Sequence, residues 1–133
     1  MMEIWDIGHS TRSEDEFLIL LDQYKIEIVA DVRRFPSSKK FPHFEKSHLE
    51  EALRKNRIEY LWLGEKLGGF RKGGYKEWTK TEEFTSGLEE LEEKALRKRT
   101  AFLCAEADYT RCHRKNIIEL LEKKEWKVHH IHS

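Results

Sequence analysis

Short apolar runs alternate with helical patterns along the whole chain, and this alternation limits the fold more than any other feature. Runs rich in apolar and β-branched residues lie at 3–8, 26–32, 58–63, 100–103 and 126–131. Between them, apolar residues recur with the spacing of one helix face. Alternation of this kind is typical of a parallel sheet with helices packed on it. We therefore predict one α/β domain over residues 1–133, with three layers: a mainly parallel, five-stranded sheet and helices on both faces.

Capping signals predict where the helices begin. Ser13 and Ser47 are each followed three residues later by a glutamate, which is the spacing of a capping box. The expected helix starts lie near Ser13, Ser47, Thr81 and Asp108. The segment 64–75 holds five of the seven glycines, and we expect it to be a functional or mobile loop.

Composition excludes several classes of protein. Lys plus Arg and Asp plus Glu both number 25, so the chain is not a strongly basic nucleic-acid binder. Charged residues make up 38%, against roughly 25% on average, and the excess of Lys, Glu and Arg is typical of thermophilic proteins. No apolar run approaches the ~18 residues of a membrane span, and the N-terminus lacks a signal-peptide pattern. We expect a cytoplasmic protein with reduced cysteines and no membrane partner.

Polar and reactive side chains follow four of the predicted strands. They lie in the segments 8–10, 31–33, 64–71 and 104–106. Ligands of open α/β sheets bind beyond the carboxyl ends of the strands, where these segments should meet. The expected catalytic residues are His9, Cys104, Glu106 and His113. The expected substrate-binding residues are Ser10, Asp31, Arg33, Arg71, Arg111 and Arg114.

The arginines of this predicted site favour an anionic ligand, because a guanidinium matches phosphate or carboxylate with two parallel bonds. The alternative is that Asp31 and Glu106 bridge Arg33, Arg111 and Arg114 in a structural ion-pair network. Phe70 and Tyr75 are candidates to stack a nucleobase beside the cations.

Cys104 lies between a predicted strand and a predicted helix. The positive end of the helix and nearby arginines favour a thiolate there, so Cys104 is either a nucleophile or a buried packing residue. Cys112 is either a packing residue or a redox partner of Cys104. Glu106 with His9 or His113 would form an acid–base pair. The cysteines lack the Cys-x-x-Cys spacing of many zinc sites, and we predict no metal and no other cofactor.

The segments of the predicted site together resemble the domain-of-unknown-function 488 family. The matching pieces are Gly8-His9-Ser10, Asp31-Val32-Arg33 with Pro36 and Ser37, Leu67-Gly68-Gly69 with Arg71, Cys104-Ala105-Glu106 and Cys112-His113-Arg114. The resemblance covers nearly the whole chain and implies an α/β fold and a cytoplasmic prokaryotic protein, but no reaction.

A weaker likeness connects residues 31–33 and the stretch that follows Cys104 with rhodanese domains, which use a cysteine as a sulfur-carrying nucleophile. The chain departs from them at Glu106 and Asp108, because two carboxylates in that loop oppose an anionic substrate and raise the pKa of a thiol.

These observations predict an enzyme that acts on an anionic, phosphate-bearing substrate, such as a nucleotide or a nucleic-acid end. Two alternatives are a non-catalytic module that binds nucleic acid or nucleotide, and rhodanese-like thiol chemistry at Cys104. The expected partners are an anionic small molecule or nucleic acid, and the oligomeric state is left open.

Overall fold

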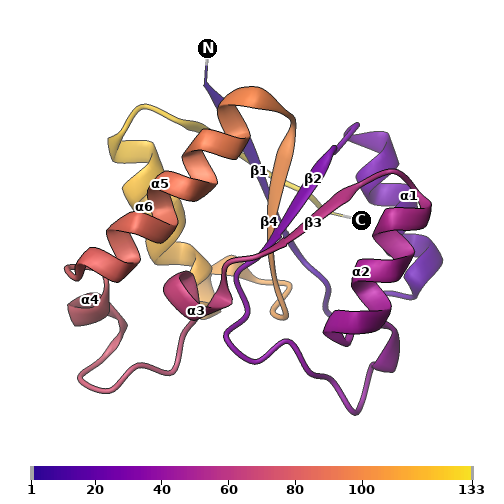
Figure 1. Cartoon of the computed structure of the whole chain (residues 1–133), viewed down its shortest axis with the longest axis horizontal. Coiled ribbons are helices and arrows are strands. Elements are labelled where there is room, and N and C mark those ends of the chain that lie inside the picture. The colour runs from indigo at the N-terminus through magenta and orange to yellow at the C-terminus, as the bar shows by residue number, and fades with distance from the viewer. Residues whose placement is uncertain (1, 133) are drawn as a thin grey trace.

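The computed structural model describes residues 2–132 and contains a five-stranded sheet in which every pairing is parallel (Figure 1). The strands are β1 (Glu3–Gly8), β2 (Ile28–Asp31), β3 (Glu59–Trp62), β4 (Thr100–Cys104) and β5 (Lys127–His130). Their order in the sheet is β3-β2-β4-β1-β5. Gly8 pairs with Cys104 and Asp31 with Leu103, so the strands leave the sheet at the same edge. The predicted parallel α/β fold is confirmed.

Helices cover both faces of the sheet. The helices are α1 (Glu14–Gln23), α2 (Lys46–Lys55), α3 (Gly64–Leu67), α4 (Tyr75–Trp78), α5 (Glu82–Arg97) and α6 (Arg114–Lys123), with two 3₁₀ turns, η1 (Pro42–Phe44) and η2 (Tyr109–Arg111). Figure 1 shows α1 and α2 on one side of the sheet and α3, α5 and α6 on the other. None of the described helices is long and apolar enough to cross a membrane.

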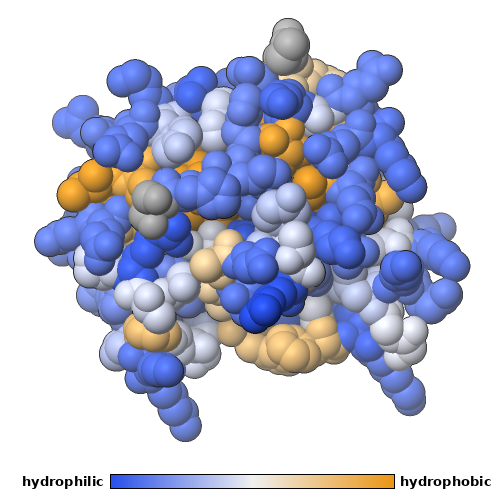
Figure 2. All heavy atoms as spheres, turned by 180° about the vertical axis from the view of Figure 1, so that it is seen from behind, coloured by the Kyte–Doolittle hydropathy of each residue, from blue (hydrophilic) through white to orange (hydrophobic). Residues whose placement is uncertain are grey.

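The sheet separates two apolar layers because successive strand side chains point to opposite faces. In β4, Phe102 packs with Leu88 of α5 and Ile117 of α6, whereas Leu103 packs with Phe17 of α1. The three-layer arrangement follows from this alternation. The face shown in Figure 2 is mostly hydrophilic, with apolar areas between hydrophilic side chains.

Three of the four expected helix starts are confirmed. Ser13 forms a complete capping box with Glu16, and Thr81 accepts a bond from the backbone N–H of Phe84. Helix α2 begins at Lys46, next to the expected Ser47, but the expected cap is wrong, because the carboxylate of Glu45 accepts the backbone N–H of Ser47.

The expected start of the fourth helix near Asp108 is also wrong. Asp108 caps the short turn η2 instead. Cys112 then adopts an extended conformation, with φ −131° and ψ 153°, and α6 begins only at Arg114. This extended step brings Cys112 to the start of α6.

The glycine-rich segment is an open loop only over residues 68–74, because α3 and α4 form single helical turns on either side. The hydroxyl of Tyr75 donates to the carbonyl of Leu67, and the indole of Trp78 donates to that of Lys66. These two bonds tie α4 to α3. Gly73 and Gly74 have φ of 86° and 93°, which glycine adopts without strain.

Candidate functional site

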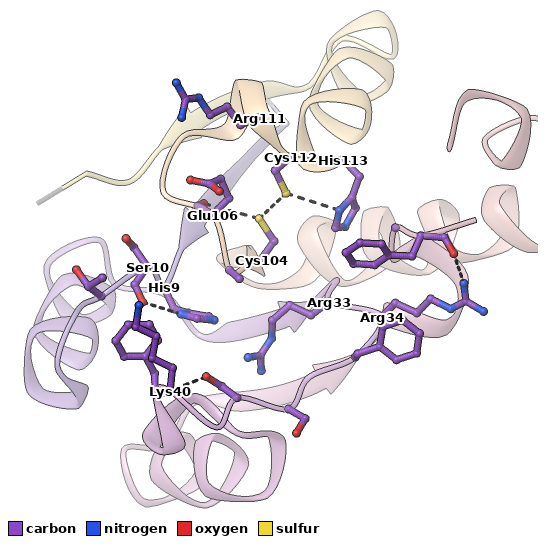
Figure 3. A pocket seen from close by; sticks show the side chains of 18 of the residues that line it. His9, Ser10, Arg33, Arg34, Lys40, Cys104, Glu106, Arg111, Cys112 and His113 are labelled. Carbon is purple, nitrogen blue, oxygen red and sulfur yellow. Dashed lines mark hydrogen bonds between the residues drawn. The ribbon is translucent and has the colours of Figure 1, made fainter. Parts of the chain in front are cut away.

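A pocket of about 720 Å³ lies at the carboxyl edge of the sheet (Figure 3). The segments that follow β1, β2 and β4 form it, together with the start of α6 and the loop after α3. The sequence-predicted residues that line it are His9, Ser10, Arg33, Cys104, Glu106, Arg111 and His113. Parallel strands with a common exit edge bring these distant residues together.

Three sequence-predicted residues do not line the pocket. Asp31 is fully buried and bonded to Arg33. Arg71 donates to the carbonyls of Gly68 and Gly64 and lies over the Trp78 ring at 4.0 Å. Arg114 is 1% exposed and forms an ion pair with buried Asp6. Each of the three has a structural partner in place of a ligand.

Several lining residues were not among those predicted. The segment between β2 and η1 contributes Arg34, Phe35 and Lys40, and the start of α6 contributes Cys112. Residues 34–46 form a basic segment that leaves the end of β2 and contains both prolines. This composition is the sequence signal that could have identified the segment as part of the pocket.

Arg33 and Asp31 form a buried, bidentate ion pair. The Arg33 Nε lies 2.9 Å from Asp31 Oδ1, and its Nη2 lies 2.7 Å from Oδ2. Nη1 donates to the carbonyl of Phe44 at 2.7 Å, and the Tyr60 hydroxyl donates to Asp31. A guanidinium has five N–H donors, and these bonds use three. Arg33 is therefore held rigidly beside the pocket, with most of its charge offset.

His9 is neutral and has one nitrogen free to accept a proton. The ring is 4% exposed and stacks on Phe44 with centroids 4.3 Å apart. Burial lowers the pKa of His9 to about 4. Nδ1 lies 3.0 Å from the carbonyl of Ser10. A carbonyl only accepts, so Nδ1 carries the hydrogen and Nε2 keeps its lone pair.

The two cysteines face each other across the pocket wall. Cys104 ends β4 and is 1% exposed, whereas Cys112 is partly exposed. Their sulfur atoms lie 2.7 Å apart, and Figure 3 shows the two side chains pointing toward each other. The backbone N–H of Arg114 points to Cys112 Sγ at 3.4 Å, and His113 Nδ1 lies 3.6 Å from that sulfur.

These contacts shift the pKa values of the two thiols in opposite directions. The hydrogen bond from Cys104 and the contact with His113 lower the pKa of Cys112 to about 4. The bond to Cys112 and burial raise the pKa of Cys104. The directions favour the charged form at Cys112 over Cys104, because the start of α6 and His113 act on the Cys112 sulfur.

His113 is fixed between three segments of the chain. Its Nε2 lies 3.0 Å from the carbonyl of Val32, which makes Nε2 the donor. The Tyr75 ring packs against it with centroids 5.2 Å apart. A Cβ on Gly69 would lie 3.2 Å from His113 Nδ1, so glycine leaves room for this ring. With Nε2 donating to Val32, Nδ1 is left facing the Cys112 sulfur.

Buried Arg114 holds the loop after β4 in place through hydrogen bonds. Its Nη2 donates to the carbonyls of Glu106 and Ala107 at 3.0 and 3.2 Å, and its Nε lies 3.2 Å from Asp6 Oδ1. A Cβ on Gly8 would lie 1.9 Å from the Glu106 carbonyl oxygen, so only glycine fits beneath the loop. Within residues 2–132 the carboxylate of Glu106 has no ion pair.

The pocket lining is predominantly cationic. Its charged residues are Arg33, Arg34, Lys40, Arg111 and Glu106. Arg111 is largely exposed and lies 3.8 Å from Asp108. Within the described part of the chain, Arg34 and Lys40 form no ion pair with a carboxylate. The expected ion-pair network is present at Asp31–Arg33, but Arg114 pairs with Asp6 and Arg111 with Asp108.

Comparison with known proteins identifies one family. The family model described as "Domain of unknown function DUF488" matches residues 13–73 and 69–121, which together span most of the chain. No curated protein and no solved structure matches the chain.

Proposed function

The chain belongs to the DUF488 family, and from its site we propose an enzyme that binds an anionic, phosphate-bearing substrate, such as a nucleotide or a nucleic-acid end. One observation carries this proposal. Four cationic side chains and a single carboxylate line a pocket that also contains Cys112 and His9, whose pKa values are both lowered.

Arg34 and Lys40 supply the attraction for the anion. Among the described residues neither charge is offset by a carboxylate, in contrast to that of Arg33, and Arg34 donates to the carbonyl of Phe70. A hydrogen bond to a charged group contributes about 1.5–3 kcal/mol. Phe35 and Phe70 are 63% and 85% exposed, with ring centroids 6.1 Å apart, beside Arg34. Aromatic faces next to cations suit a nucleobase.

Cys112 and His9 supply the chemistry in this proposal. Cys112 is the nucleophile, because the thiolate rather than the thiol attacks. Cys104 Sγ lies 2.7 Å from Cys112 Sγ, with either thiol able to donate, and forms part of the wall. His9 accepts a proton through Nε2, and the exposed carboxylate of Glu106 is the second proton carrier.

A binding module without catalysis is the second candidate, and the exposed Phe35–Phe70 pair favours it. Replacing Glu106 separates the two candidates. In an enzyme, Glu106→Gln lowers turnover while binding is kept. In a module, binding is the whole function and changes little.

Calorimetric titration of the reduced protein with inorganic phosphate and with nucleoside monophosphates tests the proposal. Binding should weaken about tenfold in Arg34→Ala and in Lys40→Ala, as expected for one charge-assisted bond. Lys39→Ala is the matched control, because Lys39 is exposed but does not line the pocket. Absence of binding by the wild type, or equal affinities of Lys39→Ala and Lys40→Ala, would contradict the proposal.

Arg33→Ala is a poor test of anion binding. It would leave the fully buried carboxylate of Asp31 without its partner, and such a loss costs about 3–5 kcal/mol of stability.

A further inference from the structure

The two cysteines are placed to form a bond with each other. They come from different elements, yet their sulfur atoms lie 2.7 Å apart, against about 2.05 Å in a disulfide. Both are free thiols. We infer that Cys104 and Cys112 are a redox-active pair that reduces a small anionic disulfide in this pocket, cycling between the dithiol and the disulfide.

The two sulfurs have different environments, which assigns their roles. Cys112 is partly exposed, lies at the start of α6 and receives the backbone N–H of Arg114. Cys104 is almost fully buried behind it. An accessible, ionised sulfur attacks, and a protected thiol beside it resolves the intermediate.

The reaction balances in two exchanges. The Cys112 thiolate attacks one sulfur of the substrate disulfide, forms a mixed disulfide and expels the first substrate thiolate, which takes a proton from solvent. Cys104 then attacks Cys112 Sγ, the mixed disulfide breaks, and the second substrate thiolate leaves with the proton of Cys104. The pair loses two electrons, and the substrate disulfide gains them. An external thiol reductant restores the dithiol by the reverse exchange.

The pocket selects the class of disulfide. Arg34 and Lys40 line the same pocket as the two thiols. Their positive charges attract a substrate with carboxylates and repel a cationic one. The volume of about 720 Å³ suits a small molecule rather than a folded protein. This activity goes beyond the proposed function, since it needs the thiol pair and carboxylate recognition but no phosphate.

Reaction of the reduced protein with oxidised glutathione, followed by intact mass, tests the inference. The wild type should lose two hydrogens and retain no glutathionyl group. Cys104→Ser should stop at a glutathionyl group on Cys112, because the resolving thiol is gone. Cys112→Ser should react at least roughly tenfold more slowly, because no thiolate is accessible. Cystamine, a cationic disulfide, should oxidise the wild type more slowly than oxidised glutathione does.

Three results would overturn the inference. The first is a wild type that keeps glutathione as a stable mixed disulfide. The second is equal rates for Cys104→Ser and Cys112→Ser. The third is a faster reaction with cystamine than with glutathione. Cys104→Ala serves as a second resolving-thiol variant, and thermal melting of each variant confirms folding. Phosphate binding by calorimetry is measured separately, so failure of one proposal leaves the other standing.

Discussion

The acidity of Cys112 depends on neighbours that can be removed one at a time. Cys104 Sγ is in hydrogen-bond contact with its sulfur, and His113 and the N–H of Arg114 add to that contact. In the wild type, the rate of alkylation by iodoacetamide should stay level between about pH 6 and 8, because Cys112 is already ionised.

Two variants of Cys104 refine this prediction. Cys104→Ala removes the thiol that contacts Cys112 Sγ. The midpoint of the pH profile of Cys112 alkylation should then move to higher pH. Cys104→Ser keeps a hydrogen-bonding hydroxyl at the same place and should move this midpoint less. A wild-type midpoint near the ordinary thiol value of about 8.5 would show that Cys112 is not a thiolate.

His9 makes stability depend on pH. Its pKa is about 4 in the folded protein and about 6.5 in the unfolded chain, so the unfolded chain binds the proton first as the pH falls. The stability from keeping His9 neutral is complete above about pH 6.5. It is lost as the pH falls to 4, by about 3 kcal/mol at most.

Urea unfolding at pH 7, 5.5 and 4 measures this loss. His9→Asn should show a smaller decrease than the wild type. His48→Gln, which changes an exposed histidine, should keep the wild-type decrease. Equal decreases in the wild type and His9→Asn would contradict the account of His9.

At the scale of elements, the loop after β4 depends on close contact with the end of β1. Gly8→Ala would place a methyl group 1.9 Å from the backbone oxygen of Glu106, which no rotamer change relieves. We expect a loss of about 3 kcal/mol in the free energy of unfolding.

Gly69→Ala is a control with a milder steric clash than Gly8→Ala. Its methyl group would meet the His113 side chain at 3.2 Å, and a side chain can shift more easily than backbone. Gly69→Ala should therefore cost less stability than Gly8→Ala but alter the alkylation rate of Cys112. A Gly8→Ala variant as stable as the wild type in urea would refute the packing described here.

Arg114 joins α6 to β1 and to the same loop. Arg114→Met should cost about 3–5 kcal/mol of unfolding free energy, because buried Asp6 loses its guanidinium partner and keeps the contact with His130. The double variant Asp6→Asn with Arg114→Met should recover part of that loss. A double-mutant cycle in urea measures the coupling, and additive effects would exclude a pairing of these two side chains.

Local sequence predicted some elements well and others poorly. The capping box at Ser13 could be predicted because both partners lie within one turn. The cap of α2 could not, because Glu45 follows a 3₁₀ turn that the pattern did not reveal. The partner of Arg114 is Asp6, more than a hundred residues away, and only the fold shows that the charge is satisfied.

For the whole molecule, the parallel sheet could be predicted because its apolar runs are short and alternate with helical patterns. The sheet explains why His9, Arg33 and Cys104 meet at one edge. A net charge of zero conceals a local excess of cations, because most carboxylates lie away from the pocket lining. Which arginines line the pocket depends on tertiary packing: Arg71 and Arg114 of the predicted substrate-binding set lie outside the lining, whereas Arg34 lies in it.

The central claim is that one pocket combines an anion-binding wall with the Cys112 thiolate. The rate of Cys112 alkylation, measured against increasing concentrations of a nucleoside monophosphate, tests it most directly. The account predicts saturable protection in the wild type and in Lys39→Ala, and a roughly tenfold higher half-protecting concentration in Lys40→Ala. An alkylation rate that does not change at any nucleotide concentration would contradict it.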